Sequence, residues 1–434
     1  MNIFLNFTKI VTNRSSEWDR QWKWIWLIAF ISGLVFRARH IDEIREAYLS
    51  LEVIHRPIAA LLVGFALLPY ILKRPLILFR GIIGLLMIFG LWRLMSTFWS
   101  IEPLWTFYRS LEFLIMVALT AITAWSLRNI TDLQRWMNWM WLWYGFLMVS
   151  IWIGAVVFPE KAFLSTPGVI PYSLAGVVPV INPNGVATIG AILGVVSFTR
   201  WLTTGKRRWL LLMMPAFTTM ILAQGRSALV GALLGILLVL ILSRRYNLTT
   251  FLGLLMGILV IVPTFRENIK SYFMRGQTEA VFWSFTGRKI LWQFTWENYV
   301  KENPWLGYGA FAAHRFKIAE DLKKNYPKFY SPETLSGLDN AWIDVTVELG
   351  IPGAIFLTMI LIAIWFSCVK VSLIGSLEES RLAIEFSGVL AVLTFRSFFT
   401  SALILHSSWS FFLIIGGISW LIVSYKGKNK SVLS

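Results

Sequence analysis

Residues 209–245 read WLLLMMPAFTTMILAQGRSALVGALLGILLVLILSRR, which is two apolar runs joined by a short polar turn. The turn is Gln224-Gly225-Arg226, and Arg244-Arg245 closes the second run. Such runs are typical of helices that cross a lipid bilayer, for which about 20 mostly apolar residues are needed. The stretch therefore predicts a pair of transmembrane helices joined by a very short turn.

The composition extends this prediction to the whole chain. Of the 434 residues, 57% are hydrophobic and 15% are charged. Soluble domains carry about 25% charged residues, so too few polar side chains remain here to cover a water-soluble surface. The net charge of +17 comes from cations that lie between the apolar runs. That distribution indicates a chain that meets a lipid bilayer and its anionic headgroups, and no nucleic acid.

The sequence offers little for a metal ion or a cofactor. Its one cysteine, Cys368, lies in an apolar run, and its four histidines are scattered. An intramolecular disulfide and a cysteine-based metal site are thereby excluded. Phosphate-binding loops and dinucleotide fingerprints are also absent from the sequence, and near Asp339, Glu348 and Glu112 there is no Asp-x-Asp-type pair at metal-ligand spacing. We therefore expect neither a cofactor nor a metal site.

We expect an all-α fold, a polytopic membrane bundle of about 12 transmembrane helices. The candidate spans lie near residues 22–36, 57–72, 81–99, 111–127, 136–158, 185–203, 209–223, 227–243, 248–264, 350–373, 386–404 and 408–424. They divide the chain into 1–264 with the first nine helices and short loops, 265–340 as one large loop, and 341–434 with the last three helices and a short basic tail.

Lysine and arginine predict the orientation. If the N-terminus is cytoplasmic, the inside connections include Arg74, Arg128, Arg207 and Arg244, while the short outside connections hold far fewer cations. Cytoplasmic loops carry this excess of positive charge, so both termini are expected in the cytoplasm. Loop 265–340 is then extracytoplasmic, and its many aromatic residues predict helices that pack back over the mouth of the bundle.

Two arginines stand where a membrane chain rarely places a charge. Arg226 begins an apolar run; it is either an interfacial arginine that reaches the headgroups or an anion ligand at a helix start. Arg396 lies in the middle of an apolar run, where a buried ion pair and a substrate role are equally compatible with the sequence. Arg288, in Gly287-Arg288-Lys289, is a further cationic point in the large loop.

The end of the large loop carries acids. Asp339-Asn340 precedes an apolar run, so Asp339 is either a helix N-cap or a chemically active carboxylate. Glu348 is expected near the membrane surface. Further upstream, Asn182-Pro183-Asn184-Gly185 predicts a turn with a helix N-cap.

Taken in order, several segments resemble the O-antigen ligase and polymerase superfamily of bacterial membrane glycosyltransferases. The segments are Ser96-Thr97-Phe98-Trp99-Ser100-Ile101-Glu102-Pro103, Asn182-Pro183-Asn184, Gly225-Arg226-Ser227-Ala228-Leu229, Thr286-Gly287-Arg288 with Trp292, Asn303-Pro304-Trp305-Leu306-Gly307-Tyr308-Gly309, and Asp339-Asn340 with Glu348-Leu349-Gly350-Ile351-Pro352-Gly353. Each segment is weakly specific alone, and their shared order makes the resemblance fairly specific.

The resemblance implies an enzyme at the outer face of the bacterial cytoplasmic membrane. Such enzymes move a glycan from an undecaprenyl-diphosphate carrier to an acceptor glycan or glycolipid, with a flippase or chain-length regulator as a possible partner. The resemblance also implies that Arg226 and Arg288 bind the diphosphate, and we add Arg396 to these two ligands.

For catalysis we take Asp339 as general base, with Glu348 in reserve and Asn340, Asn184 and His314 as supporting residues. Ligases of the superfamily usually carry histidine at the position of Asp339, so the departure favours a polymerase over an O-antigen ligase that transfers glycan to the lipid A core. A membrane solute transporter or a non-catalytic assembly partner remains the alternative of a different class. Transporters usually show internal repeats in two halves, and the sequence has none.

Overall fold

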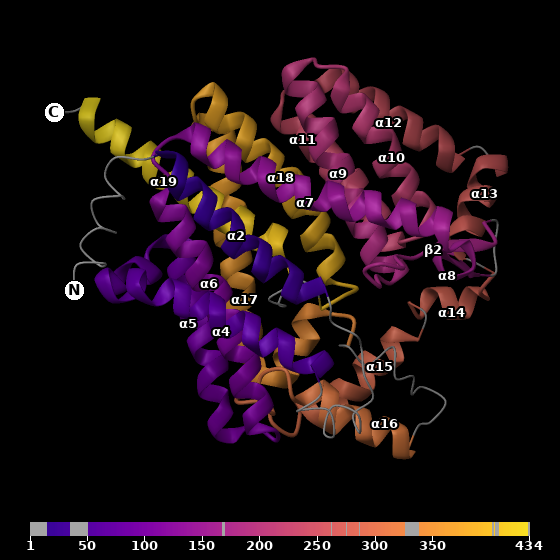
Figure 1. Ribbon diagram of the computed structural model, residues 1–434. Coiled ribbons are helices and arrows are strands. Elements are labelled where there is room, and N and C mark those ends of the chain that lie inside the picture. Colours follow the sequence, from indigo (N-terminus) through magenta and orange to yellow (C-terminus); the bar gives the residue numbers. More distant parts are fainter. Residues whose placement is uncertain are drawn as a thin grey trace.

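The computed structural model describes residues 15–34, 51–166, 170–261, 263–274, 276–285, 287–325, 338–401, 403 and 408–432. The long helices are α2 (Ser15–Leu34), α4 (Leu51–Lys73), α5 (Gly81–Met95), α6 (Pro103–Ser126), α7 (Ile130–Val157), α9 (Pro183–Thr204), α10 (Arg208–Leu222), α11 (Arg226–Leu242), α12 (Tyr246–Ile261), α17 (Ala341–Ile374), α18 (Leu377–Ser397) and α19 (Trp409–Val432). Each candidate span of the sequence overlaps one of them (Figure 1), although the expected spans 111–127 and 386–404 begin eight and nine residues after the starts of α6 and α18.

The shorter elements lie between these helices. They are η2 (Pro75–Phe79), η3 (Ser96–Trp99), α8 (Pro159–Ala162), β1 (Phe163–Ser165), β2 (Tyr172–Leu174), α13 (Pro263–Met274), α14 (Glu279–Trp283), α15 (Arg288–Thr295), η4 (Trp296–Val300), η5 (Ala313–Ile318) and α16 (Ala319–Asn325). The all-α prediction misses β1 and β2, which form a small antiparallel hairpin in which Leu164 pairs with Ser173.

Six helices of the described chain are long and apolar enough to cross a membrane. They cover Arg56–Lys73, Gly81–Trp99, Pro103–Ser126, Ile130–Val157, Pro183–Thr204 and Ala341–Ile374. Shorter apolar helices include α10 and α11. These helices support a multi-pass membrane protein, while the count of 12 spans, the side on which each connection lies and the division of the chain at residues 264 and 340 stay predictions.

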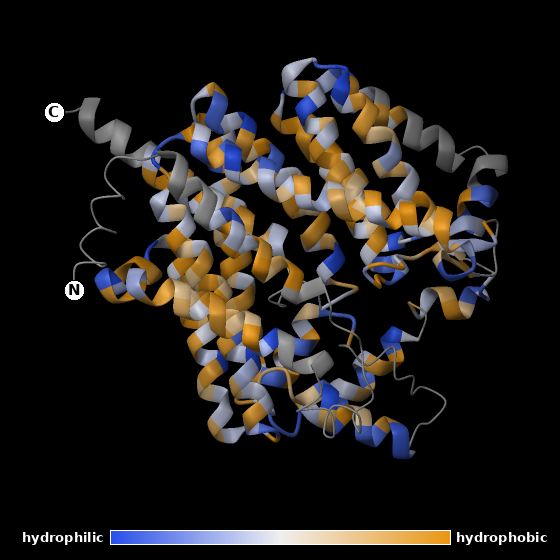
Figure 2. Cartoon of the chain, viewed as in Figure 1, coloured by the Kyte–Doolittle hydropathy of each residue, from blue (hydrophilic) through white to orange (hydrophobic). Residues whose placement is uncertain are grey.

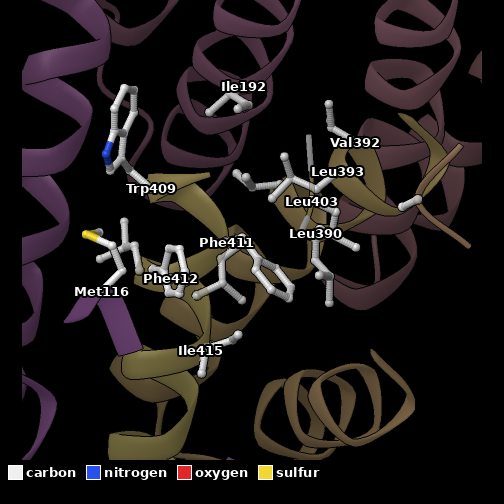
Figure 3. Close-up of a cluster of buried hydrophobic side chains, with 14 of the residues drawn as sticks. Met116, Ile192, Leu390, Val392, Leu393, Leu403, Trp409, Phe411, Phe412 and Ile415 are labelled. Carbon is white, nitrogen blue, oxygen red and sulfur yellow. The ribbon is translucent and has the colours of Figure 1, made fainter. Parts of the chain in front are cut away.

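Hydrophobic residues dominate the long helices, and hydrophilic residues gather at helix ends and along α16 (Figure 2). The centre of the core lies around α19, where Phe411, Phe412 and Ile415 are almost completely buried. Figure 3 shows these side chains with Met116 of α6 and Leu390 of α18. The first half of α19, residues 409–421, is apolar on nearly all sides, and a helical segment of that kind belongs in the interior of a bundle, which explains why its neighbours enclose it.

Close packing of α11 against α18 brings the start of one helix near the end of the other. A Cβ on Gly235 would lie 2.6 Å from the backbone oxygen of Gly388, and one on Gly231 would lie 3.2 Å from the backbone of Val392. Small residues four positions apart allow such backbone contact between membrane helices. The register is antiparallel, so the N-terminus of α11 and the C-terminus of α18 meet at one end of the bundle.

Helix α17 is broken one-third of the way along, at Gly350, where φ is +74°. The segment before it, 303–309, repairs the break. The N–H groups of Tyr308 and Gly309 donate to the carbonyl oxygens of Val347 and Glu348, and Ile351 N–H donates to Pro304. A Cβ on Gly350 would lie 2.2 Å from the backbone oxygen of Trp305, so glycine is required for both the conformation and the close approach.

The region predicted as a large loop contains α13 to α16, which lie along one edge of the long helices (Figure 1). Residues 326–337 of that region lie outside the described residues, as do Thr286 and the chain termini 1–14 and 433–434. Segment 303–312 packs against the start of α6, where the Trp105 indole N–H donates to the backbone oxygen of Phe311. The region is thus tied back onto the bundle.

Candidate functional site

A cavity of about 310 Å³ lies where α9, α11 and α18 meet the short helices α13 to α15. It is lined by Asn184, Arg226, Ser227, Val230, Phe273, Gln277, Phe282, Trp283, Phe285, Arg288, Phe395, Phe399 and Thr400. The lining of the cavity therefore combines two arginine and two amide side chains with several aromatic rings.

Arg226 reaches the cavity because it is the first residue of α11, as the sequence suggested. Its Nη2 donates to Gln277 Oε1 over 3.0 Å, and its guanidinium lies 5.6 Å from the centre of the Phe282 ring. The N-cap is Gly225, which has no side chain to accept from the first-turn N–H groups. Those groups and the helix dipole favour a negative charge at this end of α11.

Arg288 is the first residue of α15, and its Nε donates to Asp339 Oδ2 over 2.9 Å. The preceding Gly287 has a φ of +85°, a conformation that glycine adopts at little cost. Arg226 and Arg288 thus approach one cavity from two separate helix starts. Asn184, in the first turn of α9, lines the same cavity, and its helix is capped by Asn182, which accepts from Gly185 N–H over 2.7 Å.

Asp339 is not the N-cap that the sequence allowed. The cap of α17 is Asn340, whose Oδ1 accepts from the N–H groups of Trp342 and Ile343. Asn340 also donates to the backbone oxygen of Phe398, which ties the start of α17 to the end of α18. Asp339 itself has a φ of +54° and directs its carboxylate to Arg288.

Two opposing effects act on the Asp339 carboxyl. Burial disfavours the ionised form and raises its pKa, whereas the charges of Arg288 and Arg396 lower it. Burial dominates, so the pKa of Asp339 lies above the ordinary value for aspartate. A raised pKa makes a carboxylate a better proton acceptor near neutral pH.

Arg396 lies at the end of α18 and does not line the cavity itself, although Phe395 before it and Phe399 just after the helix both do. It is buried, and its Nη2 lies 3.3 Å from the backbone oxygen of Asn184. The sequence left open a structural ion pair here. The described residues form no ion pair with Arg396, and its Nε has no hydrogen-bond partner among them. Arg396 therefore adds a buried positive charge beside the site.

Glu348 and His314 do not line the cavity. Glu348 was expected near the membrane surface, yet its side chain is fully buried in α17. Arg93 Nη2 lies 3.2 Å from one of its oxygens, and His314 Nδ1 lies 3.2 Å from the other. The depth of Glu348 relative to the membrane surface stays a prediction, and both Glu348 and His314 lie outside the lining of the cavity that Arg226 and Arg288 share.

Sequence reasoning missed several residues of this region. Gln277, which holds Arg226, stands in a polar stretch without any motif that marks it. Phe395 and Phe399 flank Arg396 at helical spacing, a signal that the sequence did contain. Trp292 was part of a recognised motif, and its indole N–H donates to the backbone oxygen of Leu338 over 2.7 Å. In the described parts of the chain, no three histidine, cysteine, aspartate or glutamate side chains gather to hold a metal ion.

Residues 209–358 match the family model described as O-antigen ligase. The predicted family resemblance is confirmed. The matched region contains Arg226, Arg288 and Asp339, while Asn184 and Arg396 lie outside it. The match supports glycosyl transfer of the ligase or polymerase type from a lipid-linked glycan. No curated protein matches the chain.

Proposed function

We propose that the protein is a glycosyltransferase that joins glycans from an undecaprenyl-diphosphate-linked donor, as a polysaccharide polymerase. One observation carries the proposal: Arg226 and Arg288, from two separate helix starts, line one cavity, and Asp339 is ion-paired with Arg288 next to it. Two guanidinium groups suit a diphosphate, and one carboxylate beside them suits the activation of a hydroxyl group.

The donor diphosphate is bound by the arginines. Because Arg288 meets Asp339 through Nε, its two Nη groups form a fork that points away from that contact. Arg226 presents a second fork beside the first turn of α11. Arg396 contributes a buried positive charge beside the cavity. The apolar side of the cavity, with Phe273, Phe282 and Val230, suits the lipid part of the donor.

The reaction needs no chemistry beyond these residues. The acceptor hydroxyl oxygen attacks the anomeric carbon of the donor sugar, and the bond from that carbon to the diphosphate oxygen breaks. The electron pair leaves with the diphosphate, which stays on the carrier lipid and is stabilised by Arg226 and Arg288. Asp339 takes the proton from the acceptor hydroxyl. Asn340 supports the site by capping α17, and Asn184 supports it by lining the cavity and accepting from Arg396 Nη2 through its backbone oxygen.

The distribution of basic residues supports an outward-facing site. Helices α9 and α11 begin at the cavity and end just before Lys206 and Arg244, so the basic connections lie at the opposite end of the bundle. Positive charge favours the cytoplasm, which supports a cavity that opens at the outer face of the cytoplasmic membrane. A Glu320→Cys variant tests this, since Glu320 is exposed and Cys368 is buried. Labelling of intact spheroplasts is expected; labelling that needs a permeabilised membrane reverses the topology.

An O-antigen ligase is the second candidate, because the matching family model carries that description. The aspartate at position 339 favours the polymerase. Deletion of the gene in the source bacterium separates the two. Loss of a polymerase leaves single repeat units on the acceptor, whereas loss of a ligase leaves long chains on the carrier lipid and none on the acceptor. If the deletion left the glycans unchanged, both candidates would be refuted, and the alternative of a membrane solute transporter would be favoured. A flippase and a chain-length regulator are expected partners of the polymerase.

A further inference from the structure

The segment that carries Asp339 is held from both sides. Leu338 N–H donates to Asp344 Oδ1 over 2.9 Å, and the Leu338 carbonyl oxygen accepts from the Trp292 indole N–H. On the other side of Asp339, Asn340 is bound to the first turn of α17 and to Phe398. Asp339 lies between these fixed points with a φ of +54°, in the left-handed region that few non-glycine residues adopt.

Asp344 is the unusual member of this arrangement. It lies one turn into α17, and its side chain is fully buried. Its second oxygen accepts from the Ser401 hydroxyl, and His314 Nδ1 lies 3.8 Å from the first. Burial of a carboxylate is unfavourable unless hydrogen bonds compensate for lost water. Capping of α17 does not require Asp344, because Asn340 already accepts from the first-turn N–H groups.

We infer that Asp344 is a positioning residue for the site: by holding the N–H of Leu338, it keeps Asp339 in the left-handed conformation that faces Arg288. The inference rests on the proposed role of Asp339. Once the Leu338 bond is lost, the segment is free to relax to a negative φ at Asp339, which rotates the carboxylate away from Arg288. The three residues Ser401, Asp344 and Leu338 thereby connect the segment that follows α18 to the proposed base.

The test is a double-mutant cycle between Asp344→Ala and Asp339→Asn in the full-length chain. Glycan output of complemented cells is measured per amount of membrane-inserted protein. Displacement of a catalytic group by about 1 Å costs about 10²-fold, so Asp344→Ala is expected to lose turnover on that order. In the Asp339→Asn background the same change is expected to add little, because the group that Asp344 positions no longer acts. Asp344→Asn keeps an oxygen for Leu338 N–H and is expected to restore most of the loss.

Additive losses in the cycle, or normal output from Asp344→Ala, would overturn the inference. If Asp344→Ala fails to insert, Ser401→Ala enters the same cycle, since it removes the hydroxyl that orients Asp344 and leaves almost the same volume. Additive losses overturn the inference there as well.

A binding experiment separates failure of the positioning from failure of the proposed base. If Asp339→Asn alone keeps full output, Asp339 is not the base, and the proposed function loses that step. The affinity of the purified chain in nanodiscs for inorganic pyrophosphate then decides the positioning. Asp344→Ala is expected to weaken binding in the wild-type background and to have no further effect once Arg288→Ala is present. Independent losses of affinity contradict the positioning role.

Discussion

Replacement of Asp339 by asparagine is the sharpest test of the proposed mechanism. Asparagine is among the residues that tolerate a positive φ, so the backbone at this position keeps its conformation. Its amide oxygen still accepts from Arg288 Nε. The ion pair is lost, but the side chains of Arg288 and Asp339 are 26% and 33% exposed, and an ion pair so exposed contributes about 0–1 kcal/mol to stability.

The expected loss of activity is much larger than this change in stability. General base catalysis contributes about 10²–10⁴-fold, which corresponds to about 3–5 kcal/mol of transition-state stabilisation. If Asp339 were the N-cap of α17, its replacement by asparagine would not distinguish a base from a cap residue by stability, since asparagine and aspartate cap about equally well. That ambiguity is gone, because the cap is Asn340. Large loss of turnover with almost unchanged stability is therefore the signature of a base.

Glycan output per inserted protein and the melting temperature of the purified chain measure the two quantities. Asp132→Asn is the matched control, since Asp132 also pairs with an arginine, Arg135, on α7 and away from the cavity. The control is expected to leave both quantities unchanged. An Asp339→Asn protein that folds normally and produces glycan at the wild-type rate would refute the assignment of Asp339 as base.

Four further outcomes follow from the site. Arg226→Lys and Arg288→Lys should each weaken binding of inorganic pyrophosphate, because lysine lacks the planar fork, while Arg135→Lys should not; normal affinity in both variants removes the diphosphate assignment. Activity should fall as the pH drops through the raised pKa of Asp339. The Arg288→Gln variant should move this acid limb to higher pH, since a cation that lowers the pKa of Asp339 is lost; an unmoved limb at saturating donor contradicts the assignment of Asp339 as base. Gly350→Ala should destabilise the chain by about 1–3 kcal/mol in thermal unfolding, because a side chain at a φ of +74° is strained, and an unchanged melting temperature would contradict the break seen in α17. Excess EDTA should leave the activity of purified protein intact; inhibition that magnesium reverses would require a metal in the mechanism.

The sequence was sufficient for the class of fold and for part of the site. Apolar runs predicted the position of each long helix, because the requirement for about 20 apolar residues is written locally along the chain. Arg226 was recognised for a similar reason, since a charge at the start of an apolar run is visible within a few residues, whereas the role of Arg288 was expected from the family resemblance. The hairpin β1–β2 was missed because three-residue strands carry too short a pattern.

Tertiary structure alone decided what each polar residue meets. Asp339 and Asn340 are adjacent, and either residue type can cap a helix. Only the conformation of the chain assigns the cap to Asn340 and turns Asp339 toward Arg288, 51 positions away. Glu348 lies 255 positions from Arg93, its partner in the core, so no local pattern reveals that it is buried. Helix formation depends on neighbours in sequence, whereas ion pairs and cavities depend on which helices pack together, and packing is a property of the whole bundle.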